Sequence, residues 1–174
     1  MKEFRLTSET ILNIIPKLSA GDKIYLSGTI YTARDAAHKR IIEKMKNNED
    51  LPFNIKNACI YYAGPTPTPN YLPIGSCGPT TSGRMDIYSP KMLDAGLKVM
   101  IGKGPRSKEV IDSMIKNGAI YLCAIGGAGA LATKCIKSAQ IIAFEDLGCE
   151  SIKKIEFNDF PLIVGIDSKG GSLF

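Results

Sequence analysis

DKIYLSGTIYTARDAAHKRIIEKMKN, residues 22–47, changes its hydrophobic period halfway along. Residues 22–33 alternate and are rich in β-branched and aromatic side chains, which is typical of a strand. From Ala33 to Asn47 the apolar residues recur at helical spacing instead. A strand that runs directly into a helix is the building unit of α/β proteins, so this stretch predicts the fold class.

The same alternation continues along the chain. Strand-like runs occupy residues 57–65, 97–104, 119–127 and 140–148, and helical patterns occupy residues 107–118 and 130–139. Ser89 and Pro90 are typical of a helix start, with the hydroxyl as cap and proline in the first turn. Residues 152–170 indicate two more strands with no helix between them. We therefore predict an α/β domain with a mixed sheet flanked by helices.

Composition excludes several classes of protein. With 44% hydrophobic and 22% charged residues the chain is typical of an ordinary globular protein. Its net charge of +5 suits an acidic small molecule or acidic partner, but no dense basic run supports nucleic-acid binding. No apolar run reaches the roughly 18 residues of a membrane span, and the start shows no signal-peptide core. The five cysteines form no C-x-x-C pair, which favours the cytoplasm over a disulfide framework.

A long segment without periodicity, residues 66–86, contains GSCGPTTSGRMD. Structureless segments of this length inside a compact domain are usually functional or disordered, and the Tyr, Leu and Ile content here favours order. Its glycines and hydroxyls can present N–H and O–H groups to an anion, and Arg84 adds a fork that suits a carboxylate. The alternative is a hydroxyl-rich surface turn. The phosphate-loop lysine is absent, and Cys77 is expected to be a packed thiol.

The predicted helix places polar residues on its apolar face. Four residues share this face at about 100° per residue: Arg34, His38, Ile41 and Met45. His38 is then a hydrogen-bonded buried histidine or a functional group. Arg34 lies near the helix start, where a cation opposes the helix dipole unless an anion binds there. The alternative for Arg34 is an ion pair with Asp35 or Glu43.

Two weaker patterns follow strands. Lys103, in the IGKG of residues 101–104, can point into a site at the carboxyl ends of the strands, although lysines are common in turns. Gly127, Gly129 and Ala132 have the spacing of a dinucleotide-binding turn, and Asp146 follows about 20 residues later. NAD binding is therefore an alternative, against which stand the short helix and the missing second half of such a fold.

Four segments resemble one known family: residues 21–40 (GDKIYLSGTIYTARDAAHKR), 78–86 (GPTTSGRMD), 101–104 (IGKG) and 161–170 (PLIVGIDSKG). In order and spacing they are similar to the β subunit, or C-terminal domain, of the iron–sulfur class I fumarases and L-tartrate dehydratases. The resemblance covers nearly the whole chain, and GPTTS-x-R-M is its most specific motif.

This resemblance implies a swivelling β/β/α fold, with residues 1–174 as a single domain that forms one half of an enzyme. A separate α subunit would carry a [4Fe–4S] cluster on three cysteines, so a hetero-oligomer is expected and this chain is not expected to ligate the cluster. The implied reaction is the reversible hydration of fumarate to (S)-malate. The dehydration of L-tartrate is the alternative.

The resemblance also implies roles for individual residues. It places the catalytic base on Thr80, with Thr81 and Ser82 helping to hold the substrate. His38 matches a histidine of the family motif and is either a catalytic acid–base group or a structural residue. A dicarboxylate needs several fixed cations, and the residue patterns supply three: Arg34, Arg84 and Lys103. A carboxylate-binding module without catalysis remains a further hypothesis beside NAD binding.

Overall fold

The computed structural model describes residues 1–124 and 129–174. The strands in this part of the chain are β1 (Glu3–Thr7), β2 (Lys23–Thr32), β3 (Cys59–Tyr61), β4 (Val99–Gly102), β5 (Ile120–Ala124), β6 (Ile136–Ala143) and β7 (Ile152–Ile166). The α-helices are α1 (Ile11–Ile14), α2 (Asp35–Lys46), α3 (Ser89–Asp94), α4 (Lys108–Asn117) and α5 (Gly129–Lys134). Three short 3-10 helices complete the set: η1 (Ile15–Lys17), η2 (Ser82–Met85) and η3 (Glu145–Glu150).

The sheet is built on two long antiparallel strands, β2 and β7, which pair from Lys23 to Tyr31. On the other edge of β2 lie β1 and β3, both parallel to it. On the other edge of β7 lie β6 and β5, both antiparallel to it. Because β3, β4 and β5 pair in parallel, the strands β2, β3, β4, β5 and β7 close into a ring. This is the mixed α/β sheet that the sequence predicted, and it is consistent with a swivelling β/β/α domain.

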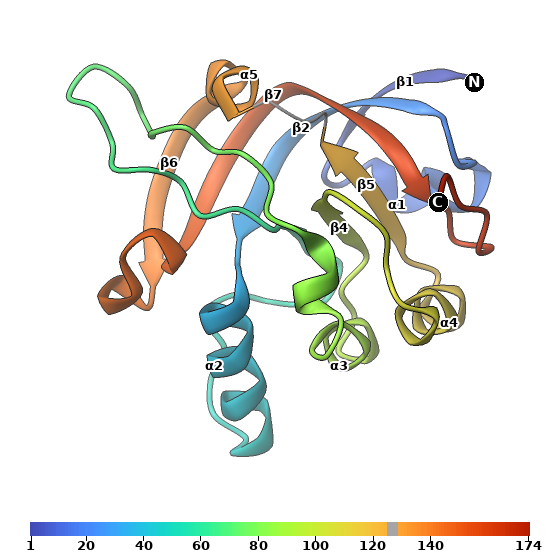
Figure 1. Cartoon of the computed structure of the whole chain (residues 1–174), viewed down its shortest axis with the longest axis horizontal. Coiled ribbons are helices and arrows are strands. Elements are labelled where there is room, and N and C mark those ends of the chain that lie inside the picture. The colour runs from blue at the N-terminus through green and yellow to red at the C-terminus, as the bar shows by residue number, and fades with distance from the viewer. Residues whose placement is uncertain (125–128) are drawn as a thin grey trace.

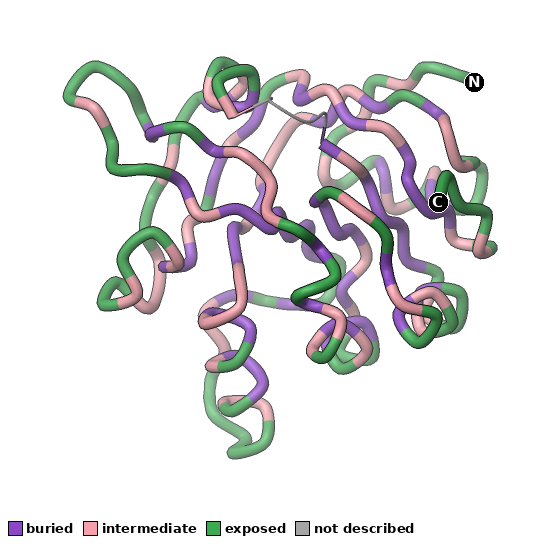
Figure 2. Tube along the Cα trace, in the orientation of Figure 1, coloured by how far each residue is buried: buried purple, intermediate pink, exposed green. Residues whose placement is uncertain are grey.

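Helices α2, α3 and α4 lie along one side of the sheet, as the lower part of Figure 1 shows. Alternate residues of the strands face two separate buried clusters. Tyr61 and Ile101 belong to the cluster that includes α1, whereas Ile60 and Met100 belong to the cluster beneath α2, α3 and α4. Figure 2 shows buried positions concentrated on the strands and exposed ones at the helix ends and loops. None of the described helices has the length and apolar character that crossing a membrane requires.

Several predicted elements are confirmed. The predicted strand and helix of residues 22–47 correspond to β2 and α2, and the predicted helix of residues 107–118 corresponds to α4. The side chain of Ser107 accepts a hydrogen bond from the Val110 amide, and Gly118 ends α4 in the left-handed region at φ 59°. The capping residues of α4 therefore act as their residue types predict.

Three predictions about elements were wrong. Residues 152–166 form one strand, β7, because both of its edges are paired; Asp159 at φ 50° is accommodated within it. Helix α5 ends at Lys134 and β6 begins at Ile136, since residues 136–143 pair with β7 instead of extending the helix. Ser89 does not cap α3, because its hydroxyl donates to the Met85 carbonyl.

Candidate functional site

The predicted site residues gather at the carboxyl ends of the parallel strands. Arg34 follows β2, the segment with Thr80 follows β3, and Lys103 comes directly after β4. Parallel neighbours end at the same edge of a sheet, and α/β proteins commonly bind ligands there. The sheet therefore brings together three stretches that are far apart in the sequence.

The segment that carries Thr80 is fixed against the ends of β3 and β4. The Thr80 amide donates to the Tyr62 carbonyl at 2.7 Å, and the Ser82 amide donates to the Lys103 carbonyl at 3.0 Å. Thr81 also pairs with Lys103 as an isolated parallel bridge. Thr80 is half-buried, whereas Thr81 is exposed. The hydroxyl-rich stretch is thus ordered by backbone pairing and presents Thr81 to the outside.

Ser82 points into the protein and joins this segment to β4 and β5. Its side chain is fully buried, and its Oγ accepts from the Lys103 amide at 3.0 Å. The Tyr121 hydroxyl lies 2.9 Å from both Ser82 Oγ and the Gly104 carbonyl oxygen. Since each hydroxyl has one hydrogen, Ser82 donating to Tyr121 and Tyr121 donating to Gly104 satisfies every group. The role of Ser82 in holding substrate stays a prediction, and its observed contacts are within the chain.

Arg84 projects from η2 and is exposed. Its Nε donates to Asp35 Oδ1 at 3.1 Å, which links η2 to the first turn of α2. The side chain of Arg84 is 55% accessible, against 30% for that of Asp35. With Nε held by Asp35, the two terminal nitrogens of the planar guanidinium are left to bind a carboxylate in bidentate fashion. The sequence patterns offered Asp35 only as a partner for Arg34 and did not indicate its contact with Arg84.

Arg34 is the N-cap residue of α2, and its partner is neither Asp35 nor Glu43. Its Nε lies 3.8 Å from Glu150 Oε1, and the same Glu150 oxygen accepts from the Ala36 amide at 3.5 Å. The predicted alternative partners of Arg34 were therefore wrong, because Asp35 is engaged by Arg84 and η3 brings Glu150 from the far end of the chain. An anion does lie at the start of α2, as the helix dipole favours: it is the Glu150 carboxylate.

His38 lies on the buried face of α2, as predicted, and is 0% exposed. Its Nδ1 is 2.8 Å from the Arg34 carbonyl oxygen, and its ring packs between Tyr62 and Tyr88. Burial lowers the pKa of His38 to about 4, so the imidazole is neutral near pH 7. In that state Nδ1 donates to Arg34, and Nε2 is a buried atom without a partner in the described residues. These contacts support the first turn of α2; the catalytic role stays a prediction.

The cysteines of this chain do not fit an iron–sulfur cluster. All five are free, and within residues 1–124 and 129–174 no three His, Cys, Asp or Glu side chains are grouped to hold a metal ion. Cys77 is a packed thiol, as expected, and burial raises its pKa to about 12.

The dinucleotide-binding alternative has little support. Gly127 lies outside the described residues, while Gly129 begins α5. In such folds the strands on either side of the turn are parallel neighbours, but β5 and β6 do not pair with each other: both pair antiparallel with β7. Asp146, the residue that would bind the ribose, is paired with Arg40 through two hydrogen bonds.

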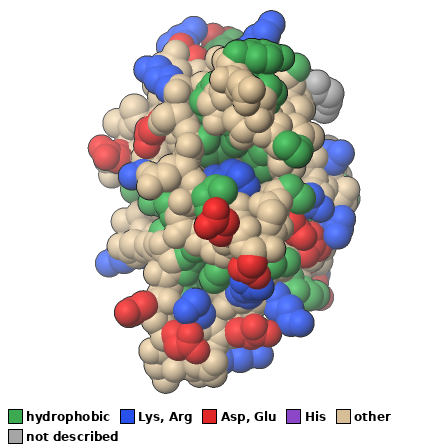
Figure 3. All heavy atoms as spheres, turned by 90° about the vertical axis from the view of Figure 1, so that its left-hand side faces the viewer, with side chains coloured by type: hydrophobic (Ala, Val, Ile, Leu, Met, Phe, Trp, Pro, Cys, Tyr) green, Lys and Arg blue, Asp and Glu red, His purple; other side chains and the backbone are tan. Residues whose placement is uncertain are grey.

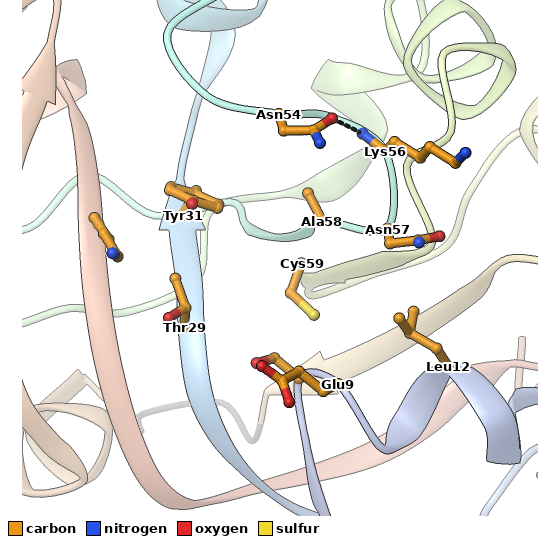
Figure 4. Close-up of a pocket in the computed structure, with 11 residues that line it drawn as sticks. Glu9, Leu12, Thr29, Tyr31, Asn54, Lys56, Asn57, Ala58 and Cys59 are labelled. Atoms are coloured by element: carbon orange, nitrogen blue, oxygen red, sulfur yellow. Dashed lines mark hydrogen bonds between the residues drawn. The ribbon is translucent and has the colours of Figure 1, made fainter.

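A surface depression of about 300 Å³ lies elsewhere, between the start of β3 and the middle of β2. Figure 4 shows Thr29 and Tyr31 on one side of it, Glu9 near Cys59, and the segment of Asn54 and Lys56 on the other. None of the predicted site residues lines it. The face of the molecule drawn in Figure 3 carries acidic and basic side chains interspersed and shows no histidine.

Comparison with known proteins identifies relatives over the whole chain. The family described as "Fumarase C-terminus" matches residues 1–174. The aerobic class I fumarate hydratase of Escherichia coli K12 is 43% identical over 94% of this chain, and fumarate hydratase 2 of Leishmania major is 44% identical over 88%. This chain spans only 30% and 28% of those two proteins. A putative L(+)-tartrate dehydratase subunit beta of Methanocaldococcus jannaschii is 40% identical over 92% of this chain and 85% of that protein.

Proposed function

The chain belongs to the fumarase C-terminus family, and on this premise we propose that it is the β subunit of a hydro-lyase that interconverts fumarate and (S)-malate. The observation that carries the proposal is the convergence of three cations and Thr80 at the carboxyl ends of β2, β3 and β4. Fumarate is a dianion, and a planar dicarboxylate needs fixed positive groups at both ends.

In this proposal the cations orient the substrate. Arg84, held by Asp35, offers its terminal nitrogens to one carboxylate. Lys103, exposed beside Thr81, supplies a point charge for the second. The side chain of Arg34 is 23% accessible and paired with Glu150. Arg34 therefore binds substrate only if a substrate carboxylate joins Glu150 at the guanidinium or displaces it. Thr81 adds an exposed hydroxyl to the same edge.

Thr80 is proposed as the base. In the direction from malate, its side-chain oxygen removes a proton from the carbon beside a carboxylate while the hydroxyl leaves the neighbouring carbon. In the hydration direction the Thr80 hydroxyl returns that proton to the alkene carbon. A threonine hydroxyl is a very weak acid, so the deprotonated form requires nearby positive charge, which Arg84 and Lys103 supply. Two backbone hydrogen bonds around Thr80 hold it in a fixed position for this step.

The other half of the site is proposed to come from a cluster-bearing α subunit in a hetero-oligomer. The M. jannaschii relative supports this, because it is named as a subunit beta and this chain covers 85% of it. The [4Fe–4S] cluster would then be held entirely by the partner. A cytoplasmic location is proposed with it, because the five cysteines are free thiols.

L-tartrate dehydration is the second candidate. It is favoured by the M. jannaschii relative, which is named as a putative L(+)-tartrate dehydratase subunit beta and of which this chain covers 85%. The substrates differ in the hydroxyls that the site must accept, and Thr81 is the exposed hydroxyl residue nearest to Lys103 in the described pairing. Either reaction uses the same three cations.

The experiment is reconstitution of the chain with an anaerobically prepared iron–sulfur α subunit, with fumarate and L-tartrate compared as substrates. We expect turnover of one of them by the complex and none by either part alone. Thr80→Ala and Arg84→Ala should each lower kcat at least about 100-fold. Thr68→Ala at an exposed position and Arg40→Ala at a partly exposed position are the controls of the same residue types.

Three results would reject the proposal. Full activity of Thr80→Ala would remove the proposed base. Binding of a dicarboxylate without turnover in any pairing would favour the non-catalytic module. Stoichiometric NAD binding by the isolated chain would favour the oxidoreductase hypothesis.

A further inference from the structure

We propose that Arg106 is a positioning residue that sets the spacing between Arg84 and Lys103. The inference rests on the proposed function, in which Arg84 and Lys103 bind the two carboxylates of one substrate and their spacing must match its length. Arg106 comes three residues after Lys103, yet its side chain is fully buried whereas Lys103 is exposed. No sequence pattern singled it out.

Arg106 connects the segment of residues 103–107, here called the Lys103 turn, to η2 through the carboxylate of Asp86. Its Nε donates to Asp86 Oδ1 at 2.7 Å, and the amide of the next residue, Ser107, donates to Asp86 Oδ2 at 2.6 Å. Asp86 directly follows η2, the short helix that carries Arg84. Both oxygens of Asp86 are therefore held by consecutive residues of the Lys103 turn.

A second contact closes on the end of the same helix. Arg106 Nη2 donates to Ser89 Oγ at 2.6 Å, and Ser89 in turn donates to the carbonyl of Met85, the last residue of η2. The Arg106 guanidinium also lies 5.3 Å from the ring centre of Tyr62 and 5.1 Å from that of Tyr121. Tyr62 accepts the Thr80 amide on its carbonyl, and Tyr121 contacts Ser82. Arg106 is thus in contact with two residues, Tyr62 and Tyr121, that support the Thr80–Arg84 segment.

The planar fork of arginine is what this arrangement uses. Nε and Nη2 donate to two different residues, Asp86 and Ser89, while the flat guanidinium lies over the rings of Tyr62 and Tyr121. A lysine keeps the charge but is a point donor with no plane. Arg106→Lys should therefore preserve the buried ion pair and loosen the angle at which η2 meets the Lys103 turn.

The first test is a double-mutant cycle in the reconstituted complex. We expect Arg106→Lys to lower kcat/KM up to about 100-fold, the effect of misplacing a positioning group by about 1 Å. Because a spacing matters only while both cations are present, Arg106→Lys should lower kcat/KM less than about 3-fold in an Arg84→Ala background. Multiplicative losses would overturn the proposal. Lys108→Gln, which removes a neighbouring exposed ion pair, is the control expected to leave activity unchanged.

The second test needs no activity and therefore separates this inference from the proposed function. In the isolated, isotope-labelled chain, the Nε–H signal of Arg84 and the amide signal of Lys103 report on the two ends of the spacing. Arg106→Lys and Asp86→Asn should shift both signals, whereas Lys108→Gln should leave both in place. If Arg106→Lys folds and moves neither signal, Arg106 does not position the site. A wild-type complex without turnover would reject the proposed function alone.

Discussion

The contact between Ser82 and Gly102 shows how closely the Thr80–Arg84 segment approaches β4. A Cβ built on Gly102 would lie 1.9 Å from Ser82 Oγ and 3.0 Å from Tyr62 Cδ2, so a side chain at this position would force the two segments apart. The first glycine of the IGKG motif is therefore explained by packing. It lets a buried hydroxyl reach the Lys103 amide, which in turn holds the cation at the strand end.

Gly102→Ala is expected to lower the free energy of unfolding by about 1–3 kcal/mol, because a methyl group has no room in this buried contact. Gly83→Ala is the matched control: its Cβ would meet nothing closer than the Pro105 carbonyl oxygen at 3.8 Å, and the change should stay within about 0.5 kcal/mol. Chemical denaturation measures both. Adding Ser82→Ala to Gly102→Ala should recover part of the loss, and failure to recover any would mean that another contact is responsible.

At the scale of the element, α2 carries a buried histidine, His38, in its first turn. His38 is neutral in the folded protein down to about pH 4, while an unfolded histidine takes up a proton near pH 6.5. The unfolded state therefore binds more protons between these values, and the native state loses stability as the pH falls from about 6.5 to about 4. Above pH 6.5 both states are neutral and this contribution is constant.

We expect His38 to destabilise the protein by about 3 kcal/mol at pH 4 relative to pH 7. The measurement is the free energy of unfolding of wild type and His38→Gln across this range, since the carboxylates that also titrate there are common to both. As the pH falls, the free energy of unfolding of wild type should decrease more than that of His38→Gln. A constant difference would show that His38 is protonated inside the fold. As His38 is the chain's single histidine, its NMR titration gives the same answer directly.

At the scale of the whole molecule, β7 closes the ring of strands. Phe160, at its centre, is 1% exposed and stacks on Phe157 with ring centres 4.5 Å apart. It also meets Tyr61 of β3 edge-on, at 5.4 Å. Phe160 of β7 thus packs across the ring of strands on β3, the strand that precedes the Thr80–Arg84 segment.

Phe160→Ala should lower the free energy of unfolding by about 3–5 kcal/mol, the usual range for removing a buried phenylalanine. Ile141→Ala on β6, where the side chain is 46% exposed, should lower it by less than about 1 kcal/mol. Thermal and chemical denaturation of the two variants provide the comparison. Equal losses of unfolding free energy in the two variants would mean that Ile141 of β6 stabilises the fold as much as Phe160 of β7 does.

Local patterns were enough for part of the fold and for the proposal of the cations. Arg84 and Lys103 stand among glycines and hydroxyls beside strand ends, and such signals lie within a few residues. The same locality explains why β2, α2 and α4 were predicted correctly. The partners of Arg34 and Arg84 were not predicted, because both are distant in the sequence. Glu150 of η3 pairs with Arg34, and Asp35 pairs with Arg84 instead of with the adjacent Arg34.

The sequence by itself determined the alternation of strands and helices, the two caps of α4 and the residue types gathered at the strand ends, since hydrophobic period and turn chemistry act over short distances. Only the tertiary structure decided that residues 152–166 are one strand, because pairing on both edges outweighs the local break at Asp159. It also decided that His38 is neutral and that Arg106 is buried behind Lys103, since burial and long-range ion pairs exist only once the sheet is closed.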